Sequence, residues 1–148
     1  MAQSVTMHGV QAEPTNQDDC LFCHVHDESI NQIMDESKNF YVRWDNFPAN
    51  TGHVEVVPKR HIVSFFELTP DAVAEAFDLM KKVQATLDQK YQPQGYTIGI
   101  NDGRAAGRTV DHLHIHLIPR YDGDVQDPRG GIRQIFPDCD PESWSSKH

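Results

Sequence analysis

Three histidines alternate with aliphatic residues in the sequence HLHIHLI, residues 112–118. In a β-strand, alternate side chains point to opposite faces, so the three imidazoles share one face and the aliphatic side chains share the other. Imidazole titrates near neutral pH, binds metal ions and acts as a base or a nucleophile. The pattern indicates a chemical site on a strand anchored in the core. A solvated strand face that is merely rich in histidine is the alternative.

Distance disfavours a single metal ion held by all three imidazoles. At about 3.3 Å per residue, the Cα atoms of His112 and His116 are ~13 Å apart. Zinc binds only ~2.1 Å from each ligating nitrogen. We therefore expect the two outer histidines to have different roles.

A second candidate site is the C-x-x-C motif CLFC, residues 20–23. A redox dithiol of the thioredoxin type needs a preceding strand and a following helix, which the flanking sequence does not indicate. A structural zinc site needs two further ligands, and His24 and His26 are the nearest in sequence. The third cysteine, Cys139, lies near the C-terminus and is expected to be inert.

Composition limits the class of protein. The 148 residues suit one domain, and 13 Lys and Arg against 22 Asp and Glu give a net charge of −9. Such a surface repels nucleic acid polymers and acidic lipids, although one locally positive pocket could still bind a small phosphorylated substrate. No apolar run approaches the ~20 residues of a membrane span, and the N-terminus lacks a secretory signal pattern, so we predict a cytoplasmic protein.

The elements that position these residues are short strands and one long helix. Thr69 is a suitable N-cap and Pro70 a suitable first helical residue, and Pro93 and Gly95 end the helix. Its apolar stripe consists of Val73, Phe77, Met80, Val83, Leu87 and Tyr91. Strands are predicted over residues 39–44, 53–57, 96–101 and 110–118.

One long helix among short strands, without strand–helix alternation, predicts a single α+β domain with a mainly antiparallel sheet. We predict a flexible lead-in over residues 1–18, the domain over residues 19–137 and a C-terminal tail over residues 138–148.

Together with its surroundings, the triad resembles the histidine triad (HIT) superfamily, and the C-x-x-C motif resembles that of its zinc-containing bacterial type. The match runs roughly from Cys20 to Arg120 and includes the loop after Asn101, the sequence VVPKRH at residues 56–61, and Asp45 eight residues before His53. The resemblance implies a compact α+β fold and a homodimer formed through the long helix and a strand. It also implies transfer or hydrolysis of nucleotidyl groups by attack on the α-phosphorus of dinucleoside polyphosphates, nucleoside phosphoramidates or acyl-adenylates.

The resemblance also implies roles for individual residues. His114 matches the nucleophile, His116 the residue that contacts the phosphate and the leaving group, and Thr109 a hydroxyl near the leaving oxygen. The backbone amides of residues 107–109 would cradle the α-phosphate. Substrate contacts are implied for Asp45 (ribose hydroxyls), Asn101 and Gly107 (phosphate loop), and Leu21, Phe22, Val25, Trp44 and Phe47 (base pocket), although these apolar residues equally suit the core.

Three features bear on the metal and on specificity. On the resemblance, zinc is held by Cys20, Cys23, His61 and His112, with His53 as the alternative to His61, and magnesium could enter with the substrate. Arg108 replaces the usual glutamine and is predicted to contact distal phosphates or an acidic partner, whereas Asp111 receives no catalytic role.

The alternatives to a hydrolase are a nucleotide-binding regulatory protein without useful turnover and a phosphorylase.

Overall fold

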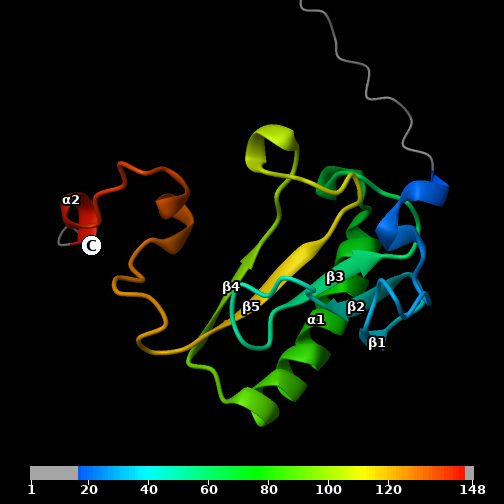
Figure 1. The fold of residues 1–148 in the computed structure, drawn as a ribbon, viewed down its shortest axis with the longest axis horizontal. Helices are drawn as coiled ribbons and strands as arrows, with labels where there is room; N and C mark the ends of the chain where they lie inside the picture. Colours follow the sequence, from blue (N-terminus) through cyan, green and yellow to red (C-terminus); the bar gives the residue numbers. More distant parts are fainter. Residues whose placement is uncertain (1–16, 146–148) are drawn as a thin grey trace, which may run out of the picture.

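The computed structural model describes residues 17–145, so most of the expected N-terminal lead-in lies outside the described residues. A five-stranded antiparallel sheet in the order β1-β2-β3-β5-β4 carries one long helix on one face (Figure 1). This architecture confirms the predicted α+β class. The elements are β1 (Ile33–Glu36), β2 (Phe40–Trp44), β3 (Val54–Pro58), α1 (Pro70–Tyr91), β4 (Gly95–Gly99), β5 (Ile115–Arg120) and the short α2 (Glu142–Ser145).

The central strands bury both faces. On the helix face, Phe40 and Val42 of β2 lie in one core cluster with Val83 and Leu87 of α1. On the opposite face, Tyr41 of β2 lies in a second cluster that includes the buried half of the C-x-x-C motif. Strand periodicity produces this division, since successive residues point to opposite faces. The second face therefore carries the candidate reactive side chains, while the first face packs against the helix.

Helix α1 follows the predicted boundaries. The Thr69 hydroxyl accepts a hydrogen bond from the amide of Ala72, and the helix ends at Gln92 in a left-handed conformation. The predicted apolar stripe is partly wrong, because Phe77 is 57% exposed while Ala76 and Leu79 are buried. Val83 and Leu87 are buried as predicted. The buried residues of α1 recur at spacings of three and four and share one face, and Phe77 lies outside that face.

The fourth predicted strand is wrong over its first half, since β5 begins at Ile115 rather than at residue 110. It continues through Pro119 to Arg120, where it pairs only with β4. A proline is tolerated there because its missing N–H faces no second neighbouring strand. His112 and His114 thus lie in the segment before the strand, and only His116 lies within it.

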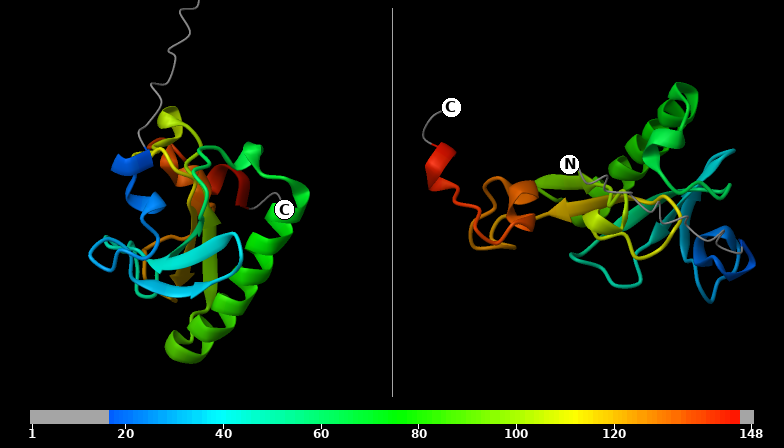
Figure 2. Two further views of the ribbon diagram at one scale, coloured as in Figure 1. Left: turned by 90° about the vertical axis from the view of Figure 1, so that its right-hand side faces the viewer. Right: turned by 90° about the horizontal axis from the view of Figure 1, so that it is seen from above.

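One strand of the sheet was not anticipated from the sequence. Strand β1 pairs with β2 at one edge of the sheet and had no clear sequence signal. After β5 the chain leaves the sheet, and residues 122–145 extend away from the helix and strands (Figures 1 and 2). Within residues 17–145, no helix combines the length and the apolar character needed to cross a bilayer.

Candidate active site and metal centre

His114 lies directly before β5, and its ring is buried. Its Nδ1 is 2.8 Å from the carbonyl oxygen of His112. A carbonyl can only accept a hydrogen bond, so this nitrogen carries the hydrogen and the lone pair of Nε2 is left unprotonated. Burial lowers the pKa of His114, and the positive charges of Arg43 and Arg108 lower it further. A neutral imidazole with an unprotonated Nε2 can act as a nucleophile at pH 7.

His116, on β5, has the opposite tautomer. The amide of Ala49 donates to Nδ1 of His53 at 3.0 Å, so the hydrogen of neutral His53 is on Nε2. That nitrogen lies 2.8 Å from Nδ1 of His116, which must accept. Burial lowers the pKa of His53 and lowers that of His116 to about 4. His116 is therefore neutral at pH 7, carries its hydrogen on Nε2 and can donate it next to His114, whose ring centroid is 5.1 Å away.

Asp45 follows β2, and its carboxylate faces the imidazoles of His53 and His116. One carboxylate oxygen accepts from the amide of Phe47 at 2.7 Å, and the other lies 3.4 Å from Nε2 of His53 and 3.9 Å from Nδ1 of His116. Burial alone would raise the pKa of Asp45, but the Phe47 amide, the neighbouring Glu55 carboxyl group and the two imidazoles together lower it. Asp45 is both a turn residue and an anionic acceptor beside the triad.

An open pocket of about 360 Å³ lies next to this acceptor. Trp44, Asp45 and His53 are among the residues that line it. Trp44 also packs edge-on against Tyr91 on the helix side, with ring centroids 6.4 Å apart. The sequence-based assignments of Asp45 and Trp44 thus fall on one pocket beside the triad.

Phe22 has a different position from the one expected of an open base pocket. It is buried, and its ring packs edge-on against His112 and His114 at centroid distances of 5.9 and 5.2 Å. It therefore supports the two imidazoles from the core. Among the other apolar candidates, Val25 is partly buried against the same cluster, whereas Leu21 and Phe47 are exposed.

The loop before the triad is braced by Asn101, whose side-chain amide donates to the carbonyl of Ala106 at 2.6 Å. Gly107 has a φ of 92°, a conformation that side-chain-bearing residues rarely adopt. The amides of Gly107 and Arg108 donate to carbonyls three and five residues earlier in the loop. In this conformation these two amides are engaged within the loop, contrary to the expectation of an open phosphate cradle. The side chain of Thr109 is exposed.

Arg108 has an acidic partner within its own chain. Its Nε donates to Asp111 at 3.0 Å, and Arg104 binds the other oxygen of the same carboxylate at 2.9 Å. Asp111 therefore has an architectural role, which agrees with its exclusion from the catalytic candidates. The charge of Arg108 still reaches the triad, since it lowers the pKa of His114.

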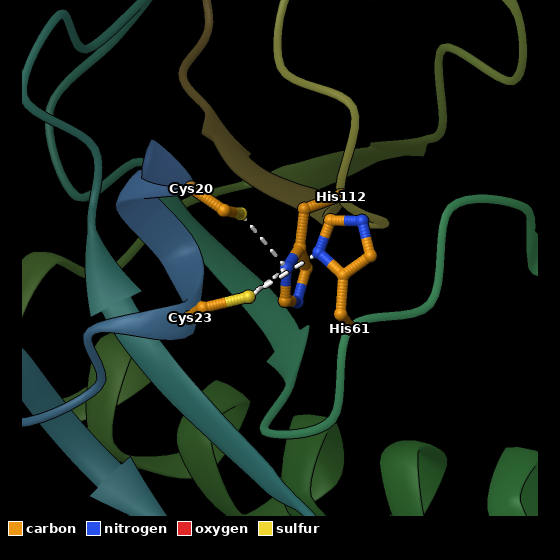
Figure 3. A group of neighbouring side chains, drawn as sticks. All are labelled: Cys20, Cys23, His61 and His112. Carbon is orange, nitrogen blue, oxygen red and sulfur yellow. Dashed lines mark hydrogen bonds between the residues drawn. The ribbon is translucent and has the colours of Figure 1, made fainter. Parts of the chain in front are cut away.

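The four zinc candidates converge at one place. Sγ of Cys20 lies 3.3 Å from Nδ1 of His112, and Sγ of Cys23 lies 3.2 Å from Nδ1 of His61 (Figure 3). All four ligand atoms are within 4.8 Å of one another. Nε2 of His112 is 2.7 Å from the carbonyl of Pro58, so it carries the hydrogen and Nδ1 presents its lone pair to the sulfurs. Two thiolates and two imidazoles fit a structural zinc ion.

The two outer histidines of the triad lie in different surroundings, in line with the different roles expected from the distance between them. His112 belongs to the Cys/His cluster, and His61 rather than His53 completes it. Two further donor groups occur within the described residues: Asp45, His53 and His116, and Glu55, His114 and His116. We assign no ion to them, because Nε2 of His53 carries a hydrogen and Nδ1 of His116 already accepts it.

Three residues that contribute to the site were not assigned there from the sequence. His53 was considered only as a metal ligand, and the buried pair Arg43 and Glu55 was not considered. A signal was present for the pair, since each is a charged residue within a strand of otherwise apolar or aromatic residues. Only the β2–β3 register, which places Arg43 opposite Glu55, shows that the two charges meet.

The HIT domain family matches residues 26–123. The asymmetrical bis(5'-nucleosyl)-tetraphosphatase of Schizosaccharomyces pombe is 38% identical over 80 residues, which are 54% of this chain and 44% of that protein. The AP-4-A phosphorylase of Mycobacterium tuberculosis is 32% identical over 94 residues, which are 63% of this chain and 48% of that protein.

A solved structure agrees with the fold. The crystal structure of a zinc-bound histidine triad family protein from Mycobacterium smegmatis has a TM-score of 0.67 and 31% identity, and the match covers 76% of this chain and 82% of that chain.

Proposed function

The chain belongs to the HIT domain family, and on that premise we propose that it is a hydrolase or transferase of nucleotidyl groups that works through a covalent nucleotidyl-His114 intermediate. Its substrate class is a dinucleoside polyphosphate or a nucleoside phosphoramidate. The observation that carries this proposal is the hydrogen bond from Nδ1 of His114 to the carbonyl of His112. That bond leaves Nε2 as an unprotonated nucleophile.

In the first step, the Nε2 lone pair of His114 attacks the α-phosphorus, so a P–N bond forms and the bond to the leaving group breaks. The Nε2–H of neutral His116 donates a hydrogen bond to the leaving oxygen or nitrogen; a phosphate leaving group departs as its anion, and an amine leaving group takes up a proton from water. The carbonyl of His112 stabilises the positive charge that develops on the ring of His114. In the second step, water attacks the same phosphorus, the P–N bond to His114 breaks, the proton of the attacking water passes to solvent, and a nucleoside monophosphate is released.

Asp45 and Thr109 would bind and orient the substrate. The anionic carboxylate of Asp45 can accept hydrogen bonds from ribose hydroxyls, and the exposed hydroxyl of Thr109 is available to the leaving oxygen. The Gly107 and Arg108 amides would have to exchange their bonds within the loop for bonds to phosphate. Any magnesium would enter with the substrate's phosphates. A zinc ion held by the Cys/His cluster would be structural, since four protein ligands leave no open position for substrate.

A panel of labelled nucleotides tests this function directly. We expect the wild-type protein to release nucleoside monophosphate from at least one dinucleoside polyphosphate or phosphoramidate, and to form an acid-labile protein adduct. Each assay is run with and without inorganic phosphate. If phosphate replaces water, a nucleoside diphosphate appears instead and the protein is a phosphorylase. Binding without turnover of any substrate would identify a regulatory protein and contradict the enzymatic proposal.

We also propose that the protein is a homodimer formed through α1 and a strand. Two exposed apolar side chains support this arrangement: Phe77 on α1 and Ile98 on β4, a strand at the edge of the sheet. Sedimentation at micromolar concentration should show a species of twice the 16.8 kDa chain mass. A single species of the chain mass would contradict the dimer.

A further inference from the structure

Glu55 is a buried acid beneath the triad that the reaction described above does not use. It is the second residue of β3, lies between two valines and is 4% exposed. In the sheet register it pairs with His116 of β5, and its Oε1 lies 3.8 Å from Nδ1 of that histidine. A carboxyl group in such a place requires compensation, because burial strongly disfavours its charged form.

Arg43 compensates part of this cost. The register places it opposite Glu55, to which its guanidinium donates, and it is equally buried. A second guanidinium nitrogen donates to the carbonyl of Ile30 at 3.0 Å, and the group lies 4.8 Å from the ring centre of Phe22. Arg43 is therefore held in place, but it supplies only one positive charge to a pocket that contains two carboxyl groups.

The second carboxyl group is that of Asp45. One oxygen of Asp45 and one of Glu55 lie 3.9 and 3.8 Å from the same atom, Nδ1 of His116, so the two acids are close neighbours. Two neighbouring carboxylates repel each other, and the repulsion is relieved when one of them holds a proton and donates it to the other. Asp45 is the weaker candidate for that proton, since its oxygens already face the donors of Phe47 and His53. The chemistry of the two environments therefore assigns the proton to Glu55.

We propose that Glu55 is a positioning residue whose carboxylic acid donates a hydrogen bond to Asp45 and thereby fixes that carboxylate next to His53 and His116. This inference rests on the proposed function, in which Asp45 accepts the ribose hydroxyls. Glu55 itself contacts neither substrate nor the reacting phosphorus.

The ionisation of the two acids supports this assignment. Burial, followed by the negative charge of Asp45, raises the pKa of Glu55 to about 7, against the opposing charge of Arg43. The pKa of Asp45 is lowered. Because the folded-state pKa of Glu55 is raised, the neutral acid is present below pH 7 and is lost as the pH rises through about 7.

The charged or titratable groups near Glu55 come from several segments. Strand β2 contributes Arg43 and Tyr41, the residue after it is Asp45, His114 lies directly before β5, and β5 contributes His116. Of these, Arg43 is the permanent cation. When Glu55 ionises, it can no longer donate to Asp45, and two carboxylates then share the one charge of Arg43. Their repulsion would displace Asp45 and weaken substrate binding, so we expect KM to rise more than kcat falls.

The test compares wild type with Glu55→Gln and with the matched control Glu28→Gln, which changes an exposed glutamate. Glutamine keeps a donor for Asp45 and an acceptor for Arg43 but cannot titrate. The substrate is a dinucleoside tetraphosphate, since it has no terminal phosphate that titrates near neutrality. From a pKa of about 7, kcat/KM of wild type and of Glu28→Gln should fall about tenfold between pH 6 and pH 8. In Glu55→Gln the fall should be less than about twofold.

An infrared titration tests the shared proton without any substrate or variant. At pH 6 the exposed acids are ionised. A carbonyl-stretch band of a protonated carboxylic acid in the wild-type protein therefore reports a buried acid. This band should disappear as the pH rises through about 7. The inference is overturned if wild type lacks this band at pH 6, or if a folded Glu55→Gln keeps the wild-type pH profile. If no nucleotide is turned over, the proposed function fails while the infrared titration still decides the state of Glu55.

Discussion

Replacing His114 by alanine is expected to abolish turnover, with kcat at least about 10³-fold below wild type. The variant lacks the Nε2 lone pair that forms the P–N bond, and no neighbouring group can replace it. The Nε2 of His116 carries a hydrogen because its Nδ1 accepts from His53. Single-turnover assays with a labelled dinucleoside polyphosphate measure both product release and the protein adduct, and the adduct should be absent from the variant.

A matched control separates the loss of the nucleophile from general damage. His24→Ala removes an exposed imidazole that contacts only the carbonyl of Asp18 among the described hydrogen bonds. We expect this variant to turn over substrate at the wild-type rate. Circular dichroism and thermal unfolding of His114→Ala should show a folded protein. Equal turnover and equal adduct in wild type and His114→Ala would disprove covalent catalysis at this residue.

Replacing Cys23 by serine is expected to remove the bound zinc and to destabilise the fold by several kcal/mol, on the order of half or more of the stability of a small domain. Cys23 lies within 3.5 Å of Nδ1 of both His61 and His112. Its loss would therefore leave three ligands around the ion. Elemental analysis of protein purified without chelator should give about one zinc per wild-type chain and much less in the variant.

The same His24→Ala variant is the control for the metal, because His24 is next to the C-x-x-C motif in sequence but lies outside the cluster. It should retain about one zinc per chain. Chelation of zinc from wild type should lower its melting temperature towards that of Cys23→Ser. Wild-type protein without metal, or zinc lost from His24→Ala and kept by Cys23→Ser, would contradict the assigned ligand set.

The long helix was predictable because its signals are local. Thr69 and Pro70 mark its start, and the predicted apolar positions from Val73 to Tyr91 span about five turns. Strand β1, in contrast, exists because β2 offers it a partner, and its short sequence IMDE does not alternate clearly. Strand signals of this kind depend on pairing with distant residues, which a single sequence does not reveal.

By itself, the sequence determined which groups could react: the alternating histidines, the paired cysteines and the α+β frame that holds them. The tertiary structure decided what each group does. Backbone carbonyls from Pro58 and His112 select the tautomers of His112 and His114, so one imidazole faces two sulfurs and the other presents a nucleophilic nitrogen. It also brought Arg43 and Glu55 together under the site. Hydrogen-bond direction and burial set the proton on each group, and both arise only when segments far apart in sequence come into contact.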